Sequence, residues 1–118
     1  MDETAPVAED DFNALLDLLD AQTMREVVEL FMASAPERLA SAHRGLDAGD
    51  GVVAATAFHT MRSGCGQLGA RQLEALCATA ERMAKHGDLA GAAGCLAAAE
   101  VEFVRCRAWF ESRGWMSA

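Results

Sequence analysis

The chain has 118 residues, of which 52% are hydrophobic and only 6% aromatic, so it suits one domain with a core of Ala, Leu, Val and Met. The formal net charge is −8, which argues against a nucleic acid or an anionic membrane as the partner. No apolar run approaches the roughly 20 residues of a membrane span, and no signal peptide is recognisable. These features predict a cytoplasmic protein without membrane insertion.

Residues 1–8 are predicted to form a flexible acidic tail, and residues 9–118 a single helical domain. A short helix is expected over about residues 10–19. Thr23 is predicted to cap the next helix, because Glu26 three residues later completes a capping box. The apolar residues expected to face inward from these two helices are Phe12, Leu15, Leu16, Leu19, Val27, Leu30, Phe31, Leu39, Ala42 and Leu46.

Pro36 lies inside the second helical pattern and is expected to kink or interrupt it near residues 33–35, because proline has no backbone N–H. The segment DAGDG at 47–51 is predicted to end this helix. Gly49 would follow the last helical turn and Asp50 would cap the next helix.

Three further helices are expected over about residues 51–66, 71–86 and 89–112. The segment LGA at 68–70 joins the first two, and Gly87 with Asp88 separates the last two. Short connections make consecutive helices antiparallel neighbours. The predicted fold class is therefore all-α, an antiparallel up-down four-helix bundle with a short extra N-terminal helix. The inward residues expected in the last two helices are Leu73, Leu76, Cys77, Ala80, Met83, Leu96, Ala99, Phe103, Cys106 and Phe110.

The four cysteines indicate neither a disulfide framework nor a metal site. No pair has CxxC spacing, and the cysteines and histidines fit no zinc template. Because each cysteine lies in an apolar stretch, we expect buried free thiols in a reducing compartment. These residues are Cys65, Cys77, Cys95 and Cys106.

The third predicted helix carries a histidine beside its apolar seam. His59 follows the inward Phe58 directly, so it is rotated by about 100° toward solvent. Arg62 is placed to reach an anion carried on the imidazole. An exposed histidine without function is the plain alternative. The expected seam consists of Ala54, Phe58, Met61, Cys65 and Leu68, and the residues sharing the histidine's face are Thr56, Arg62 and Ser63.

Small residues follow the histidine within two turns. Ser63, Gly64 and Gly66 clear bulk from the helix surface, so that another protein can approach closely. Each helical glycine destabilises a helix by about 1 kcal/mol relative to alanine, which calls for an explanation. Close helix packing or early termination of the helix is the alternative reading of both glycines.

The segment HTMRSGCGQLGA, which begins at His59, resembles the signature of histidine phosphotransfer (HPt) domains, and LEALCATAE resembles a downstream family segment. The resemblance covers about residues 57–82 in detail. It implies a four-helix bundle that carries a phosphoryl group on His59 in a two-component phosphorelay. Two positions depart from the family pattern: Arg62 replaces the usual lysine, and Ser63-Gly64 inverts the usual order.

The resemblance also implies the partners. A response-regulator receiver domain or a hybrid sensor histidine kinase would exchange the phosphoryl group with this chain, and the receiver would supply the acceptor aspartate and Mg²⁺. The sequence contains no Walker-type loop, no glycine-rich kinase loop and no aspartate cluster for Mg²⁺. We therefore expect a monomeric phosphoryl carrier, not an ATP-using enzyme, with no cofactor or metal of its own.

Individual roles follow from general chemistry and from the family positions. A neutral imidazole attacks phosphorus through one ring nitrogen while the other holds a proton. Glu81 occupies the position where the family often has a Glu or Gln partner for the histidine, so we expect it to accept that proton's hydrogen bond. A solvated pair with Lys85 is the alternative for Glu81, and Lys85 and Arg82 are otherwise interpreted as surface charges. Arg62 would offset part of the phosphoryl charge, and Lys85 and Arg82 are more distant possibilities for the same role.

The surface around His59 is predicted to bind the receiver through mostly small residues. Ser63 and Gln67 have hydroxyl and amide groups that can also reach the phosphoryl group, although Gln67 is equally well explained as a polar helix end. His43 and His86 lack such a neighbourhood and are interpreted as surface residues. The predicted partner-binding residues are Ala55, Thr56, Ser63, Gly64, Gly66 and Gln67.

Two alternatives to phosphotransfer remain from the sequence. In one, an HPt-like module binds a receiver or another signalling protein without being phosphorylated, which the Ser63-Gly64 inversion keeps open. In the other, the chain is a plain helical dimerisation or adaptor domain with an apolar patch. Trp109, Phe110 and Trp115 would form that patch, unless they close the end of the bundle.

Overall fold

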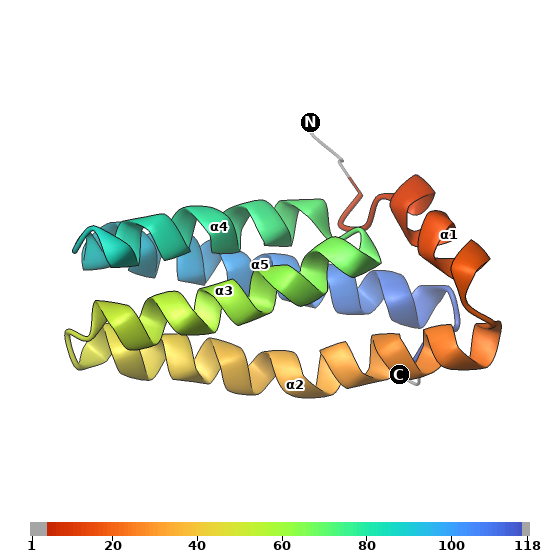
Figure 1. Ribbon diagram of the computed structural model, residues 1–118, viewed down its shortest axis with the longest axis horizontal. Helices are drawn as coiled ribbons and strands as arrows, with labels where there is room; N and C mark the ends of the chain where they lie inside the picture. Colours follow the sequence, from red (N-terminus) through yellow and green to blue (C-terminus); the bar gives the residue numbers. More distant parts are fainter. Residues whose placement is uncertain (1–4, 117–118) are drawn as a thin grey trace.

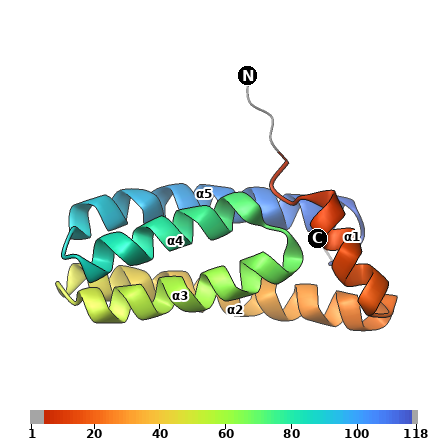
Figure 2. The same cartoon turned by 45° about the horizontal axis from the view of Figure 1, so that its top comes forward.

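The computed structural model describes residues 5–116, which form five helices and no strand (Figure 1). The helices are α1 (Glu9–Leu18), α2 (Ala21–Asp47), α3 (Gly51–Leu68), α4 (Arg71–Lys85) and α5 (Leu89–Ser112). Helices α2 to α5 run alternately up and down, and α1 lies across one end of them (Figure 2). The predicted up-down four-helix bundle with a short N-terminal helix is confirmed.

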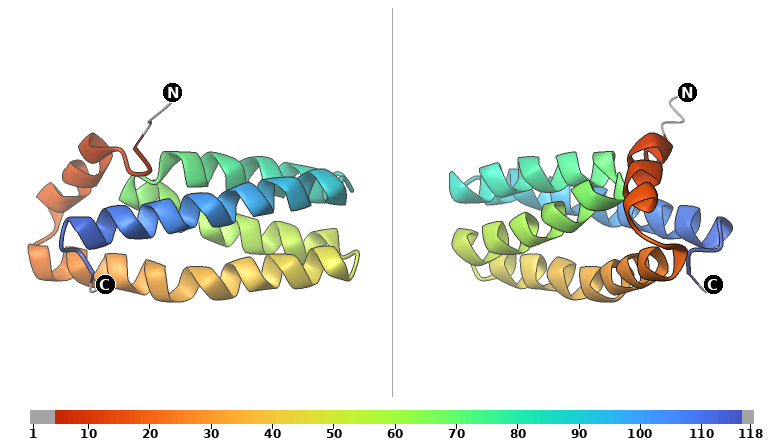
Figure 3. Two further views of the ribbon diagram at one scale, coloured as in Figure 1. Left: turned by 180° about the vertical axis from the view of Figure 1, so that it is seen from behind. Right: turned by 45° about the vertical axis from the view of Figure 1, so that its right-hand side comes forward.

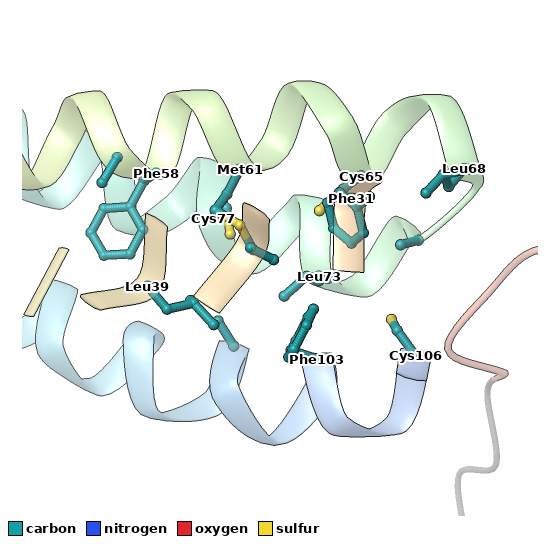
Figure 4. Close-up of a cluster of buried hydrophobic side chains, with 14 of the residues drawn as sticks. Phe31, Leu39, Phe58, Met61, Cys65, Leu68, Leu73, Cys77, Phe103 and Cys106 are labelled. Carbon is teal, nitrogen blue, oxygen red and sulfur yellow. The ribbon is translucent and has the colours of Figure 1, made fainter. Parts of the chain in front are cut away.

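The core lies between the four long helices. Helix α3 packs against α2 and α4, and α5 packs against α4 and α2, which closes the bundle (Figure 3). Side chains from α2, α3, α4 and α5 point into the shared interior, among them Phe31, Phe58, Leu73 and Phe103 (Figure 4). The predicted α3 seam is buried throughout, at Ala54, Phe58, Met61, Cys65 and Leu68.

Short polar and glycine segments set the helix ends as predicted. Asp50 accepts hydrogen bonds from the backbone N–H groups of Val52 and Val53, both at 3.1 Å. Asp88 does the same for Gly91 at 2.9 Å. Gly49, Gly69 and Gly87 all have positive φ angles, which glycine adopts without strain. None of the helices in residues 5–116 is long and apolar enough to cross a membrane.

Helix α2 differs from its prediction in three ways. It begins after Asp20, whose side chain accepts from the Thr23 N–H at 2.7 Å, so Asp20 and not Thr23 is the cap. It continues through Pro36 without interruption, because packing along its whole length outweighs one missing backbone hydrogen bond. Leu30, expected to face inward, is 70% exposed.

The segment before α1 packs against the bundle. Residues 1–4 of the predicted tail lie outside the described residues, whereas Val7 is fully buried and the Ala8 N–H donates to the Gly69 carbonyl at 2.8 Å. Phe12 then meets three rings from the C-terminal end of the chain at centroid distances of 5.3–5.8 Å. Those rings, Trp109, Phe110 and Trp115, close the end of the bundle and do not form an exposed patch.

Gly69 offers a test of this closure. A Cβ at Gly69 would lie 2.9 Å from the Ala8 carbonyl oxygen, in a residue whose φ is +78°. Gly87 has a similar φ of +83° but nothing within 4 Å. We expect Gly87→Ala to lower the free energy of unfolding by about 1–2 kcal/mol through backbone strain alone, and Gly69→Ala to lower it clearly more.

Urea unfolding of both variants would measure these losses. The difference between them reports the contact between the segment before α1 and the α3–α4 turn. Equal losses would show that this segment contributes nothing to the stability of the bundle.

Candidate functional site

His59 lies in the middle of α3, with 57% of its side chain exposed. The apolar seam fixes the rotation of α3 and leaves the imidazole at the edge that faces α4. Because α3 and α4 are antiparallel neighbours joined at Gly69, His59 and Glu81 lie at similar distances from that joint and meet across the helix pair. The predicted pairing of these two residues is therefore found in the structure.

Glu81 binds three side chains at once, although only 5% of its own side chain is exposed. Its Oε2 lies 3.2 Å from His59 Nδ1 and 2.9 Å from Lys85 Nζ. Its Oε1 accepts from Arg62 Nε at 2.7 Å. We call these four residues the Glu81 cluster. Glu81 is thus paired with both His59 and Lys85, but it is buried, so the solvated Glu81–Lys85 pair that the sequence left open is not what the structure shows.

The charges in the cluster keep Glu81 ionised. Burial raises the pKa of the Glu81 carboxyl, but hydrogen bonds from Lys85 and Arg62 and their positive charges outweigh it, so the pKa lies below its ordinary value. The cluster then holds one carboxylate and two cations beside the imidazole. It therefore carries one net positive charge in a chain whose overall formal charge is −8.

Two contacts of His59 Nδ1 require opposite tautomers. If Nδ1 carries the proton, it donates to Glu81 Oε2 and leaves the Nε2 lone pair free. If Nδ1 is bare, it accepts from Arg62 Nη2, which lies 3.3 Å away, and Nε2 carries the proton. Only the first arrangement makes Nε2 a nucleophile. The buried carboxylate favours it, because a proton on Nδ1 satisfies a charged acceptor.

A cavity of about 650 Å³ opens beside the imidazole. It lies between α3, the C-terminal end of α4 and the N-terminal end of α5. His59, Glu81 and Lys85 form its polar part, and Arg62 is not among its lining residues. Ala55 and Thr56 border it on α3, but Ala55 is only 4% exposed and offers little surface to a partner. The remaining lining residues are Gly49, Gly51, Val52, Ala84, Gly87 and Leu89.

The two helical glycines have different surroundings. A Cβ on Gly64 would lie 2.9 Å from the Phe31 ring of α2, so close helix packing accounts for this glycine. A Cβ on Gly66 would lie 2.8 Å from a Glu74 carboxylate oxygen, and Gly66 itself is exposed. The packing alternative raised by the sequence thus applies to Gly64.

The other predicted residues lie on the exposed face of α3. The Ser63 hydroxyl donates to the His59 carbonyl at 3.1 Å, within its own helix. Gln67 is exposed and borders, with Gly64, a small second cavity of about 180 Å³ between α2 and α3. His59 therefore lies on a surface with one cavity on each side of α3.

The remaining charged and histidine candidates separate clearly. His43 pairs with Glu100 at 2.9 Å, and His86 Nδ1 lies 2.8 Å from the Arg82 carbonyl oxygen, so neither joins the cluster. Arg82 contacts Thr79 and the Ala78 carbonyl. Lys85, which the sequence analysis left among the surface charges, belongs to the cluster. Its i+4 spacing from Glu81 is the feature of the sequence that indicates this contact. Within residues 5–116, no group of three or more His, Cys, Asp or Glu side chains could hold a metal ion.

Comparisons with known proteins identify the family and the fold. The family model described as the Hpt domain matches residues 26–109, a range that contains the whole Glu81 cluster. No significant match was found among curated proteins. The fold is similar to that of histidine-containing phosphotransfer protein B (HptB) from Pseudomonas aeruginosa PAO1, with a TM-score of 0.88 and 24% identity over 94% of this chain and 96% of that chain.

The lowered pKa of Glu81 predicts how pH acts on the cluster. We expect Glu81→Gln to lower the free energy of unfolding at pH 7 by about 1–2 kcal/mol, because it removes a buried acceptor of charged donors while the half-exposed cations regain water. A carboxyl whose folded-state pKa is depressed stabilises the fold above its unfolded-state value of about 4.3. The stabilisation disappears as the pH falls through the lower folded-state value.

Urea unfolding of the wild type and of Glu81→Gln between about pH 7 and pH 3 measures this difference. Glu74→Gln, on the same helix, is the matched control. A loss that stays constant over the whole pH range would show that the carboxylate charge is not what holds the cluster together.

Proposed function

The chain belongs to the Hpt domain family, whose members transfer phosphoryl groups through a histidine in two-component signalling, and on this premise we propose that His59 is its phosphoryl carrier. The observation that carries the proposal is the contact between His59 Nδ1 and the buried carboxylate of Glu81 at 3.2 Å. This contact directs Nδ1 toward the bundle and leaves Nε2 available to a partner.

The transfer uses the lone pair of Nε2. That nitrogen attacks the phosphorus of a phosphorylated aspartate on a receiver domain, the N–P bond forms, and the P–O bond to the aspartate breaks. The aspartate leaves as a carboxylate, and the proton stays on Nδ1. The ring thereby gains positive charge, which the Glu81 carboxylate offsets from its hydrogen-bonded position. The same steps in reverse return the phosphoryl group.

Charge in the Glu81 cluster suits the product. A phosphorylated side chain carries roughly two negative charges at neutral pH. Arg62 and Lys85 together supply two positive charges within the cluster, of which Glu81 neutralises one. Phosphoryl transfer depends chiefly on positioning and on such charge stabilisation, and Hpt proteins act as carriers, not as catalysts.

Hpt domains bind receiver domains in phosphorelays. We propose that a receiver docks over the exposed residues of α3, chiefly Thr56, Ser63, Gly66 and Gln67, and brings the aspartate and Mg²⁺ with it. A hybrid sensor kinase would reach the same face. A monomer suffices for this reaction, since the cluster comes from one chain. The free thiols of the described cysteines suit the reducing cytoplasm.

Substitution of the histidine tests the function. We expect the wild type to become labelled when mixed with phosphorylated receiver domains and Mg²⁺, and the label to be acid-labile and alkali-stable. His59→Gln should take up no label, while His43→Gln and His86→Gln should match the wild type. Circular dichroism checks that each variant keeps its helices.

Label on His59→Gln at the wild-type level would disprove the assignment of the site. Binding of a receiver without any label on the wild type would instead favour the docking module that is not phosphorylated. The receiver that labels the wild type at the highest rate would be identified as the cognate partner.

A further inference from the structure

Lys85 and Arg62 both contact Glu81, but their attachments differ. Arg62 donates through Nε to Oε1 at 2.7 Å, and its Nη2 lies 3.3 Å from His59 Nδ1, with 39% of the side chain exposed. Lys85 contacts Glu81 through Nζ, which lies 2.9 Å from Oε2, and 60% of its side chain is exposed. Arg62 therefore has Oε1 of Glu81 to itself, whereas Lys85 shares Oε2 with His59; the approach of Arg62 Nη2 to Nδ1 is a hydrogen bond only when Nδ1 is bare.

The two cations also differ in whether they border the cavity beside the imidazole. Arg62 is directed at Nδ1, the nitrogen that remains unphosphorylated in the proposed reaction. Lys85 borders the 650 Å³ cavity together with His59 and Thr56, whereas Arg62 does not. Lys85 Nζ and His59 Nδ1 contact the same carboxylate oxygen, so the ammonium group lies at most two hydrogen-bond lengths from Nδ1. Its flexible stem and three donors allow it to follow a new anion.

Glu81 decides which cation can move. It is buried, so it must keep hydrogen-bond partners when the phosphoryl group forms. If Lys85 leaves, Arg62 Nε and the Nδ1 proton still satisfy both carboxylate oxygens. If Arg62 leaves, Oε1 loses the guanidinium donor at 2.7 Å and the ring loses a neighbour on the Nδ1 side. Moving Lys85 is the less costly change.

We propose that Lys85 is the cation that contacts the phosphoryl group on His59, and that Arg62 remains on Glu81 as a positioning residue. This inference rests on the proposed function of His59 and refines it. It gives the direct contact to Lys85, which the sequence left as a more distant possibility, and not to Arg62. The two residues thus divide one task, Arg62 fixing the carboxylate and Lys85 meeting the transferred group.

The test uses phosphoramidate, a small phosphoryl donor, so that no receiver is needed. Nε2 of His59 attacks its phosphorus, the N–P bond to the ring forms, and ammonia leaves. Phosphorus NMR then follows the second ionisation of the bound phosphoryl group as the pH is varied. In typical phosphorylated side chains this ionisation has a pKa of about 6. His59→Gln identifies any signal from His43 or His86.

The variants are Lys85→Gln, Lys85→Arg, Arg62→Gln and Arg82→Gln. A contacting cation lowers the pKa of an acid by about one unit or more. We expect Lys85→Gln to raise the phosphoryl pKa by about one unit, Lys85→Arg to restore most of the wild-type value, and Arg62→Gln to raise it by less than half as much. Arg82→Gln removes an equal charge from the same helix and should change nothing.

A phosphoryl pKa that rises in Arg62→Gln but not in Lys85→Gln would overturn the inference and return the role to Arg62. Equal small shifts in Lys85→Gln and Arg82→Gln would also overturn it, because they would reflect overall charge only. Failure of every receiver to exchange with a chain that phosphoramidate does label would defeat the proposed relay function and leave the Lys85 result standing. No label at His59 would overturn both.

Discussion

The buried carboxylate of Glu81 is the constraint on which the site depends. A carboxylate with 5% of its side chain exposed must be paired, and this one is paired with His59, Arg62 and Lys85. Each pairing restricts its partner: the imidazole has one nitrogen directed inward, and the two cations are drawn toward one edge of the bundle. The carboxylate can do this only because α3 and α4 pack closely enough for residues 22 positions apart to touch.

Helix rotation, in turn, decides what the carboxylate can reach. The apolar seam of α3 orients Phe58 into the core, and His59 follows at the edge as a geometric consequence. On α4, the buried residues Cys77, Ala80 and Ala84 fix the rotation so that Glu81 lies beside the core and Lys85 one turn further along the same edge. The site is thus a by-product of core packing in two helices, with no loop needed to build it.

The parts of this picture that local sequence determines were predictable, and the parts that depend on contacts between helices were not. Apolar spacing and the glycine and aspartate residues of the turns placed α3, α4 and α5 to within two residues of their bounds. The N-cap of α2 was misassigned because Asp20 and Thr23 are both good caps, and only the folded chain chooses between them.

Contacts across helices carry the remaining differences. Nothing local to Gly64 reports that the Phe31 ring approaches it, so packing and docking explanations were indistinguishable from sequence. The sequence left the role of Lys85 open, because its spacing from Glu81 is also that of an ordinary solvated pair. Only the burial of Glu81 makes that pair part of a site, and burial is a property of the assembled bundle.

The charge distribution shows why the cluster needs its excess cation. The chain as a whole is acidic, and the long-range field around it opposes an acidic partner such as an aspartyl phosphate. That field is screened over about 8 Å at physiological ionic strength, whereas contacts inside the cluster are shorter and partly shielded from water. The acidic helix α1 lies across the end of the bundle where α4 begins, away from Lys85 at its other end (Figure 1). Separating these charges lets an acidic protein present a locally positive surface at His59, where two cations outnumber one carboxylate.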